Sequence, residues 1–132
     1  MASFPFELVS PERIIFSGEV ETVVIPASEG EMTLLADHAP MMTSLKTGFL
    51  VVGSGKGEER ILVQGGFVDV GPKGATVLAE RAMPVSEVTG DILAREISRA
   101  ETEHETVEDP VLKAEAADTV AQLREAKARL GL

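Results

Sequence analysis

The sequence has no cysteine, no tryptophan and no tyrosine, so phenylalanine is its only aromatic residue. Without cysteine the chain can form no disulfide, no thiolate nucleophile and no cysteine-ligated metal centre. No apolar run approaches the roughly 18 residues that span a bilayer. Residues 1–7 also lack the basic and apolar regions of a signal peptide. We therefore expect any membrane association to come through a protein partner or a surface contact.

Basic residues are also scarce, with 12 Lys and Arg against 22 Asp and Glu and a formal net charge of −10. This charge repels nucleic-acid phosphates and anionic lipid headgroups, which makes both poor partners. Hydrophobic residues make up 44% of the chain, as in ordinary folded proteins. At 132 residues, the chain is long enough for one domain, or for a compact domain with a small appendage.

The composition changes near Met83-Pro84. Residues 1–84 hold 10 of the 12 Gly, 6 of the 7 Pro and all five Phe, whereas residues 85–132 are rich in Ala, Glu and Arg. Regularly spaced turn formers with alternating apolar residues between them predict short antiparallel strands packed as a β-sandwich. We therefore divide the chain into a sandwich domain, residues 1–84, which should fold alone, and a helical domain, residues 85–132.

Alternation and turn residues place the strands within the first domain. Gly53-Ser54-Gly55-Lys56-Gly57 and Gly71-Pro72-Lys73-Gly74 each read as the turn of a hairpin. Asp37-His38-Ala39-Pro40 ends a short apolar run. The predicted strand runs are residues 4–9, 14–24, 32–35, 49–52, 60–63, 67–70 and 75–79.

The second domain has the apolar spacing of two helices. Leu93, Ile97, Ala100, His104 and Val107 step by four and three and so share one helical face. Asp109-Pro110 then supplies an N-cap and a proline at the first helical position. A second stripe follows, made of Leu112, Ala116, Val120, Leu123 and Leu130. The pattern predicts an antiparallel two-helix hairpin.

Several patterns could carry chemistry, but none is complete. Gly53–Gly57 lacks the spacing of a phosphate-binding loop and is followed by a predicted strand instead of a helix. His38 and His104, the only histidines, fall in different predicted domains, so neither a metal site nor a Ser-His-Asp triad is expected. The pairs Glu29/Glu31 and Glu58/Glu59 favour surface solubility over acid–base catalysis. We predict no catalytic, metal or cofactor site.

The stripes in the second half could also form a helix lying on a membrane. Such helices carry a basic polar face, whereas Asp118, Gln122, Glu125 and Arg129 make this one acidic and mixed. Packing within the chain or against a partner helix explains the stripes better.

Four segments, in order and in spacing along nearly the whole chain, carry a family resemblance. They are residues 6–12 with Phe16-Ser17-Gly18, then Ser28-Glu29-Gly30-Glu31, then His38-Ala39-Pro40, and residues 64–70 followed by Val77-Leu78-Ala79. Each is weak alone. Together with the appended helix pair they resemble the epsilon subunits of bacterial F-type ATP synthases.

The resemblance implies a sandwich of about ten short strands followed by an antiparallel helical hairpin. It implies a non-catalytic central-stalk subunit that couples the gamma subunit to the c-subunit ring at the cytoplasmic face of the bacterial inner membrane. Glu29, Gly30 and Glu31, with His38, Ala39 and Pro40, would lie toward the ring. Because these six residues are polar or turn-forming, we expect the strongest gamma contacts to come from exposed aliphatic side chains elsewhere on the sandwich. The hairpin would inhibit ATP hydrolysis when it extends toward the alpha and beta subunits.

Two departures from the family pattern matter. Ala36-Asp37 stands where family members usually have Pro-Gly, which affects the shape of the following turn. Asp118 stands where nucleotide-binding members carry an arginine, and an acid repels phosphate, so ATP binding is not carried over. A small-ligand or nucleotide-sensing module remains the alternative function. A small hydrolase is disfavoured because no catalytic constellation is present.

Overall fold

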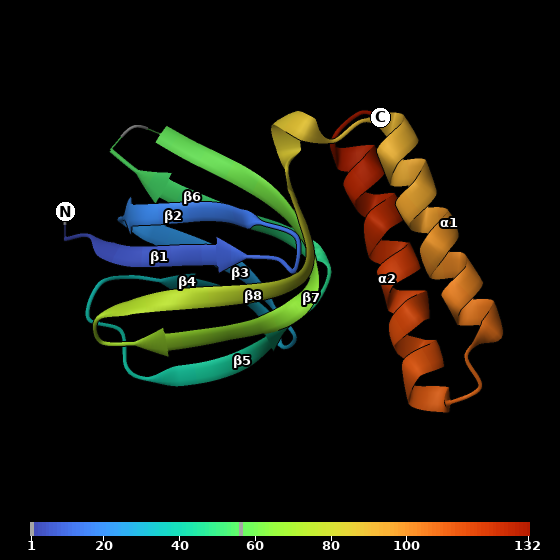
Figure 1. The fold of residues 1–132 in the computed structure, drawn as a ribbon, viewed down its shortest axis with the longest axis horizontal. Helices are drawn as coiled ribbons and strands as arrows, with labels where there is room; N and C mark the ends of the chain where they lie inside the picture. Colours follow the sequence, from blue (N-terminus) through green and yellow to red (C-terminus); the bar gives the residue numbers. More distant parts are fainter. Residues whose placement is uncertain (1, 56) are drawn as a thin grey trace. The chain divides into compact units, whose positions relative to one another are not determined.

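The computed structural model describes residues 2–55 and 57–132 and divides them into two compact units, residues 1–86 and 87–132 (Figure 1). Each unit is described by itself. The first is a β-sandwich and the second is a pair of helices, which confirms the predicted fold class. That the first unit folds alone stays a prediction.

The first unit contains eight strands among its described residues. They are β1 (Phe4–Val9), β2 (Ile14–Val20), β3 (Thr22–Ala27), β4 (Gly30–Leu34), β5 (Met41–Leu45), β6 (Gly48–Ser54), β7 (Gly57–Gly71) and β8 (Gly74–Pro84), followed by a 3-10 turn at Val85–Glu87. The hydrogen-bonded order is β2-β1-β8-β7-β5-β3-β4, and β6 pairs with both β3 and β7. All pairs are antiparallel except β1 with β8, which the expectation of a purely antiparallel sandwich missed.

The two longest strands, β7 and β8, account for most of the difference between eight strands and the expected ten. β7 pairs with β6 as far as Val63 and with β5 from Gly66 onward. β8 stays beside β7 along this path, and Figure 1 shows the two strands curving together. One bent strand therefore takes the place of two shorter strands at this corner of the sandwich.

The core of the sandwich follows the period-2 alternation of the strands, because successive side chains point to opposite faces. Along β1, Phe4, Phe6 and Leu8 are buried, and Val68 and Val70 repeat the pattern along β7. The other buried hydrophobic residues of this core are Val20, Val23, Ile25, Ala27, Leu34, Leu45, Leu50, Val52, Ile61, Val63, Ala75, Val77 and Ala79.

The second unit consists of α1 (Gly90–Thr106) and α2 (Pro110–Arg129). The Thr89 hydroxyl caps α1 by accepting from the backbone N–H of Ile92 at 3.2 Å. The Asp109 carboxylate caps α2 by accepting from the N–H of Val111 at 2.8 Å, and Pro110 occupies the first turn, as predicted. Buried residues of the pair are Leu93, Ile97, Ala100, Ala116, Leu123 and Ala126.

One part of the predicted helical stripe is wrong. Leu112 lies on the same face of α2 as Ala116 and Leu123, yet 52% of it is exposed, and its neighbour Val111 is 65% exposed. Both residues stand in the first turn of α2, next to the connection at which α1 ends. The apolar stripe of α2 therefore extends beyond the part of the helix that packs against α1.

Candidate functional site

The first predicted site turn joins β3 to β4 through Ser28 and Glu29. Gly30 follows with a backbone φ of +135°, which strongly favours glycine. The turn is fastened to β5, because the N–H of Ser28 donates to the Ser44 carbonyl at 3.0 Å and the Ser44 hydroxyl donates to the Ser28 hydroxyl at 2.9 Å. Glu29 and Glu31 are both exposed. A fixed backbone thus presents two free carboxylates to solvent.

The second predicted site turn joins β4 to β5. Asp37 has a φ of +60°, and it is the only non-glycine among the described residues with a positive φ. This is the conformation that a glycine would adopt at no cost, and aspartate is one of the few other residues that tolerates it. The turn therefore keeps a glycine-like backbone despite the Ala36-Asp37 departure. His38 is half-buried, while Ala39 and Pro40 are exposed.

The Asp37 backbone gives a direct test of this turn. We expect Asp37→Val to lower the free energy of unfolding by about 1–2 kcal/mol, because a β-branched residue is strained at positive φ. Asp37→Gly and Asp37→Asn should leave it within about 0.5 kcal/mol of the original chain. Urea denaturation followed by circular dichroism measures all three. Equal stability of the valine and glycine variants would contradict the left-handed backbone.

The structure does not bring the two turns together. They stand at opposite ends of β4, a strand of five residues, and are thus separated by at least about 13 Å along it. They do share one border of the sheet, because β4 is the last strand in the hydrogen-bonded order. The six predicted residues are therefore arranged along an edge and do not converge on a pocket.

The remaining candidates are scattered. His38 belongs to the sandwich and His104 to α1. Within residues 2–55 and 57–132, no three His, Asp or Glu side chains are grouped as a metal ion would require. Ser54 pairs with Gly57 where β6 turns into β7, although Lys56 of this predicted turn lies outside the described residues. Asp118 is exposed on α2.

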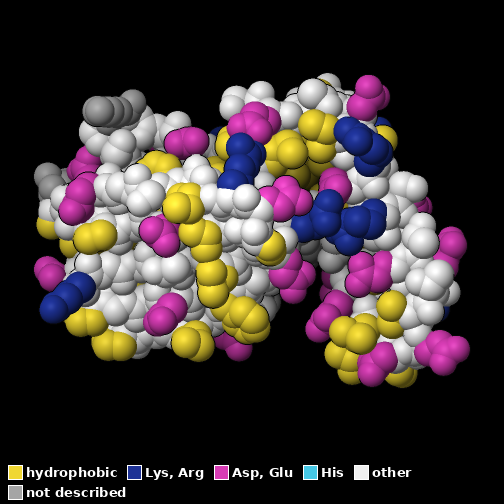
Figure 2. All heavy atoms as spheres, viewed as in Figure 1, with side chains coloured by type: hydrophobic (Ala, Val, Ile, Leu, Met, Phe, Trp, Pro, Cys, Tyr) yellow, Lys and Arg dark blue, Asp and Glu magenta, His cyan; other side chains and the backbone are white. Residues whose placement is uncertain are grey.

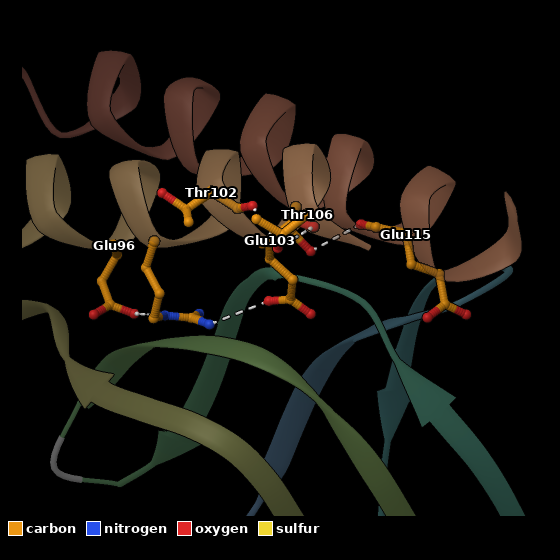
Figure 3. A network of polar contacts seen from close by, with 7 residues as sticks. Glu96, Thr102, Glu103, Thr106 and Glu115 are labelled. Carbon is orange, nitrogen blue, oxygen red and sulfur yellow. Dashed lines mark hydrogen bonds and ion pairs between the residues drawn. The ribbon is translucent and has the colours of Figure 1, made fainter. Parts of the chain in front are cut away.

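The hairpin carries a polar network on its surface (Figure 3). The Arg99 guanidinium lies 3.5 Å from the Glu96 carboxylate and 3.4 Å from that of Glu103, one helical turn away on either side. Across the two helices, Arg124 contacts the Glu101 carboxylate at 2.8 Å. Apart from Glu96, whose side chain is only 16% exposed, these groups lie open to solvent, and surface pairs of this kind contribute at most about 1 kcal/mol each to stability. They form a solvated ion network, and nothing in them resembles a catalytic constellation.

Sequence reasoning anticipated exposed apolar side chains on the sandwich but did not say which. The structure exposes five large apolar side chains of the sandwich: Ile14, Leu35, Met42, Phe67 and Leu78. Phe67 and Leu78 occupy the outward positions of strands whose other outward residues, such as Asp69 and Thr76, are polar. An apolar residue at an outward position among polar ones was the sequence signal for these exposed side chains. It identifies them only when the register of the strands is known.

Comparison with family models gives the class of protein to which the sandwich belongs. Residues 3–85 match the family model of the β-sandwich domain of ATP synthase delta/epsilon chains. Across described residues, no helix is long and apolar enough to cross a bilayer.

Curated relatives narrow this to one family. The ATP synthase epsilon chain of Mesorhizobium japonicum is 47% identical over 122 residues, which cover 92% of this chain and 90% of the relative. That of Rhizobium etli is 53% identical over 104 residues, covering 78% and 77%. The chain belongs to the family of ATP synthase epsilon chains, which are stalk subunits of that enzyme complex.

Solved structures agree on the fold. A chain in the mitochondrial ATP synthase of Euglena gracilis, solved as an OSCP/F1/c-ring assembly, matches with a TM-score of 0.75 at 22% identity, covering 98% of this chain and 82% of its own. A chain in the central stalk and c-ring of the Tetrahymena thermophila enzyme matches with a TM-score of 0.68 at 13% identity, covering 95% and 96%.

Proposed function

We propose that this chain is a non-catalytic subunit of the central stalk, which couples the gamma subunit to the c-subunit ring during ATP synthesis. The match to epsilon chains over most of the chain carries this proposal. The solved assemblies with the same fold are described as containing F1, the central stalk and the c-ring, which supports these partners. In a bacterium the complex would place the chain at the cytoplasmic face of the inner membrane.

The edge of the sandwich at β4 is the side that we assign to the ring. Its two end turns expose Glu29 and Glu31 at one end and Ala39 and Pro40 at the other. Charged side chains on an edge strand also discourage pairing with a further strand. The edge is thus suited to contacts made by side chains and turns. The ring would contact it at both end turns of β4.

The hairpin is the part that we assign to regulation. It forms a compact unit of its own, and only Leu93, Ile97 and Leu123 are large buried side chains in it. Few apolar anchors make a helix pair easy to rearrange, because small differences in partner contacts then choose between its states. We propose that it inhibits ATP hydrolysis when it extends to contact the alpha and beta subunits.

Reversing one charge on the β4 edge tests the orientation. We expect Glu31→Lys to weaken association with purified c-ring by roughly tenfold, because a misplaced charge at an interface is costly. Binding to an assembly of the alpha, beta and gamma subunits should stay unchanged. Surface-immobilised c-ring and fluorescence titration measure the two affinities.

Glu58→Lys is the matched control, since Glu58 is also exposed and lies in the sandwich at the start of β7. It should leave both affinities unchanged. Loss of gamma binding in Glu31→Lys with normal ring association would show that the sandwich is turned the other way.

A further inference from the structure

The helical hairpin leaves apolar side chains uncovered at the end where α1 passes into α2. Val111 is 65% exposed and Leu112 52%, and Val107, the C-cap of α1, is half-buried. Asp109 holds the backbone here, because its carboxylate accepts from the N–H of Val111 at 2.8 Å and from that of Leu112 at 3.3 Å. We call Val107, Val111 and Leu112 the apolar tip.

Acidic residues border the apolar tip. Residues 101–119 carry seven Asp and Glu against one Lys, a formal charge of −6. Glu108 precedes the two exposed apolar residues, Glu115 lies about one helical turn beyond Leu112, and both carboxylates are exposed. In Figure 2, hydrophobic side chains gather at the end of the hairpin that carries the α1–α2 connection, with acidic side chains around them. An exposed apolar patch with a polar rim is typical of an interaction site.

The other end of the hairpin has the opposite charge. Residues 90–100 and 120–132 carry five Lys and Arg against three Asp and Glu, a formal charge of +2. Since α2 has 20 residues, it is about 30 Å long, whereas physiological salt screens charges over about 8 Å. The basic end therefore does not neutralise the acidic border, and the tip attracts basic surfaces by itself.

The apolar tip is available to a partner while the two helices stay paired. The large apolar side chains Leu93, Ile97 and Leu123 are buried in the pair and would be exposed if the helices separated. Val111 and Leu112 are already exposed, so a partner can bury them without breaking the hairpin. A protein that binds the tip in this form stabilises the paired state against an extended one.

The acidic border excludes several occupants. A second copy of this chain would bring a border of the same sign, and anionic lipid headgroups and nucleic-acid phosphates are repelled as well. The fitting partner is a protein surface with an apolar pocket bordered by Lys or Arg. Residues 1–84 and 85–132 each have a formal charge of −5, so the partner that the proposed function places against this chain, the gamma subunit, should present basic surface to both.

We propose that the apolar tip docks the paired hairpin into a basic-bordered apolar pocket of the gamma subunit and so holds the hairpin in its non-inhibitory state. This inference rests on the proposed function and adds the contact that opposes extension of the hairpin. The sandwich keeps the main contacts with gamma. Val111 and Leu112 are the anchors of the added contact, and Glu108 and Glu115 select the basic border and speed its approach. Release of the tip shifts the hairpin toward the extended, inhibiting state.

Removing the anchors tests the direction of this shift. The full chain is added in saturating amount to a purified assembly of alpha, beta and gamma, and ATP hydrolysis is measured. Val111→Ser with Leu112→Ser should raise the ratio of inhibited to active complexes at least roughly fivefold. The control Leu132→Ser removes an apolar side chain, 45% exposed, from the other end of the hairpin and should leave hydrolysis unchanged. Thermal melts should show both variants folded, because all three positions are exposed.

A locked hairpin measures the tip contact separately from inhibition. The chain has no cysteine, so a short bismaleimide added to Glu101→Cys with Arg124→Cys joins only these two positions, whose original side chains meet at 2.8 Å across the helices. The locked chain, labelled at its N-terminus, is titrated with the same assembly and followed by fluorescence. In this background, Val111→Ser with Leu112→Ser should raise Kd at least roughly tenfold, while Leu132→Ser should leave it unchanged.

The acidic border is tested in the locked chain by removing charge alone. Glu108→Gln with Glu115→Gln should slow association and flatten its dependence on salt, while dissociation changes little. Glu58→Gln with Glu59→Gln, at exposed positions of the sandwich, is the charge-matched control and should leave the association rate unchanged.

The outcomes separate this inference from the proposed function. Faster hydrolysis with the Val111/Leu112 variant than with the original chain would assign the tip to the inhibitory contact with alpha and beta. Unchanged hydrolysis, or an unchanged Kd of the locked chain, would remove the holding contact. Each of these overturns the inference and leaves the central-stalk function intact, whereas failure of the original chain to bind any gamma-containing assembly would remove both. Self-association in sedimentation that the Val111/Leu112 variant abolishes would assign the tip to a second copy.

Discussion

Gly66→Ala is expected to abolish the folded sandwich at ordinary temperatures. A Cβ at this position would overlap the Leu78 carbonyl oxygen and would lie 2.8 Å from the Cα of Ala79, so the clash is with backbone that cannot swing aside. The φ of +126° adds strain, because residues with a side chain rarely adopt it. We expect a loss of about 4 kcal/mol or more, which is comparable with the whole stability of a domain of this size.

Gly65 is the matched control for Gly66. Its φ is also positive, at +68°, but a Cβ there would meet only the end of the flexible Glu80 side chain. Gly65→Ala should therefore lose about 1–2 kcal/mol and still fold. Soluble yield and thermal melts of the purified proteins separate the two variants. A melting temperature of Gly66→Ala within a few degrees of Gly65→Ala would contradict the close approach of β7 and β8.

These two glycines also show why the sequence predicted the strands only in part. Two successive glycines ordinarily interrupt a strand, so residues 60–63 and 67–70 were predicted as separate runs. The structure instead carries β7 through Gly65 and Gly66, where it changes partner from β6 to β5. A single sequence does not reveal that a glycine serves a close approach between strands, because the approaching backbone of β8 lies far along the chain.

Other differences have local causes. β5 was missed because Met41-Met42-Thr43-Ser44 offers little apolar alternation, and its pairing with β7 is what defines it. The predicted run from Ile14 to Val24 is two strands, with Glu21 between them. The hairpin turn at residues 71–74 and the cap at Asp109 were predicted correctly, because each depends on residues adjacent in sequence.

For the candidate site too, features that depend on adjacent residues could be predicted, and features that depend on strand register could not. The motifs around Glu29 and His38 were found in the sequence, and the glycine-like φ of Asp37 fits the family pattern. Their placement at opposite ends of β4 depends on strand register, and so does the alignment of outward apolar residues across strands, which brings together residues as distant as Val9 and Leu78. No periodicity within one strand contains that information.

Leu123→Ala is expected to unfold the helical hairpin while leaving the sandwich folded. Leu123 is fully buried and is one of only three large buried side chains in α1 and α2, so its truncation should remove about 2–5 kcal/mol. The other buried positions of α2 are Ala116 and Ala126, which have little surface with which to compensate. Helices of 17 and 20 residues are marginal without a packed face. Neither helix should therefore persist alone.

Hydrogen exchange on the full chain measures this directly. Amide protection across α1 and α2 should fall close to that of an unfolded chain in Leu123→Ala, while protection of β7 and β8 stays as in the original chain. Leu112→Ala is the control, because that leucine is 52% exposed and its loss should change protection little. Since the proposed gamma and ring contacts belong to the sandwich, Leu123→Ala should still assemble into the complex, and ATP hydrolysis should rise as inhibition is lost. A parallel loss of protection in β7 and β8 would mean that the two units unfold together, and the hairpin could not then switch independently.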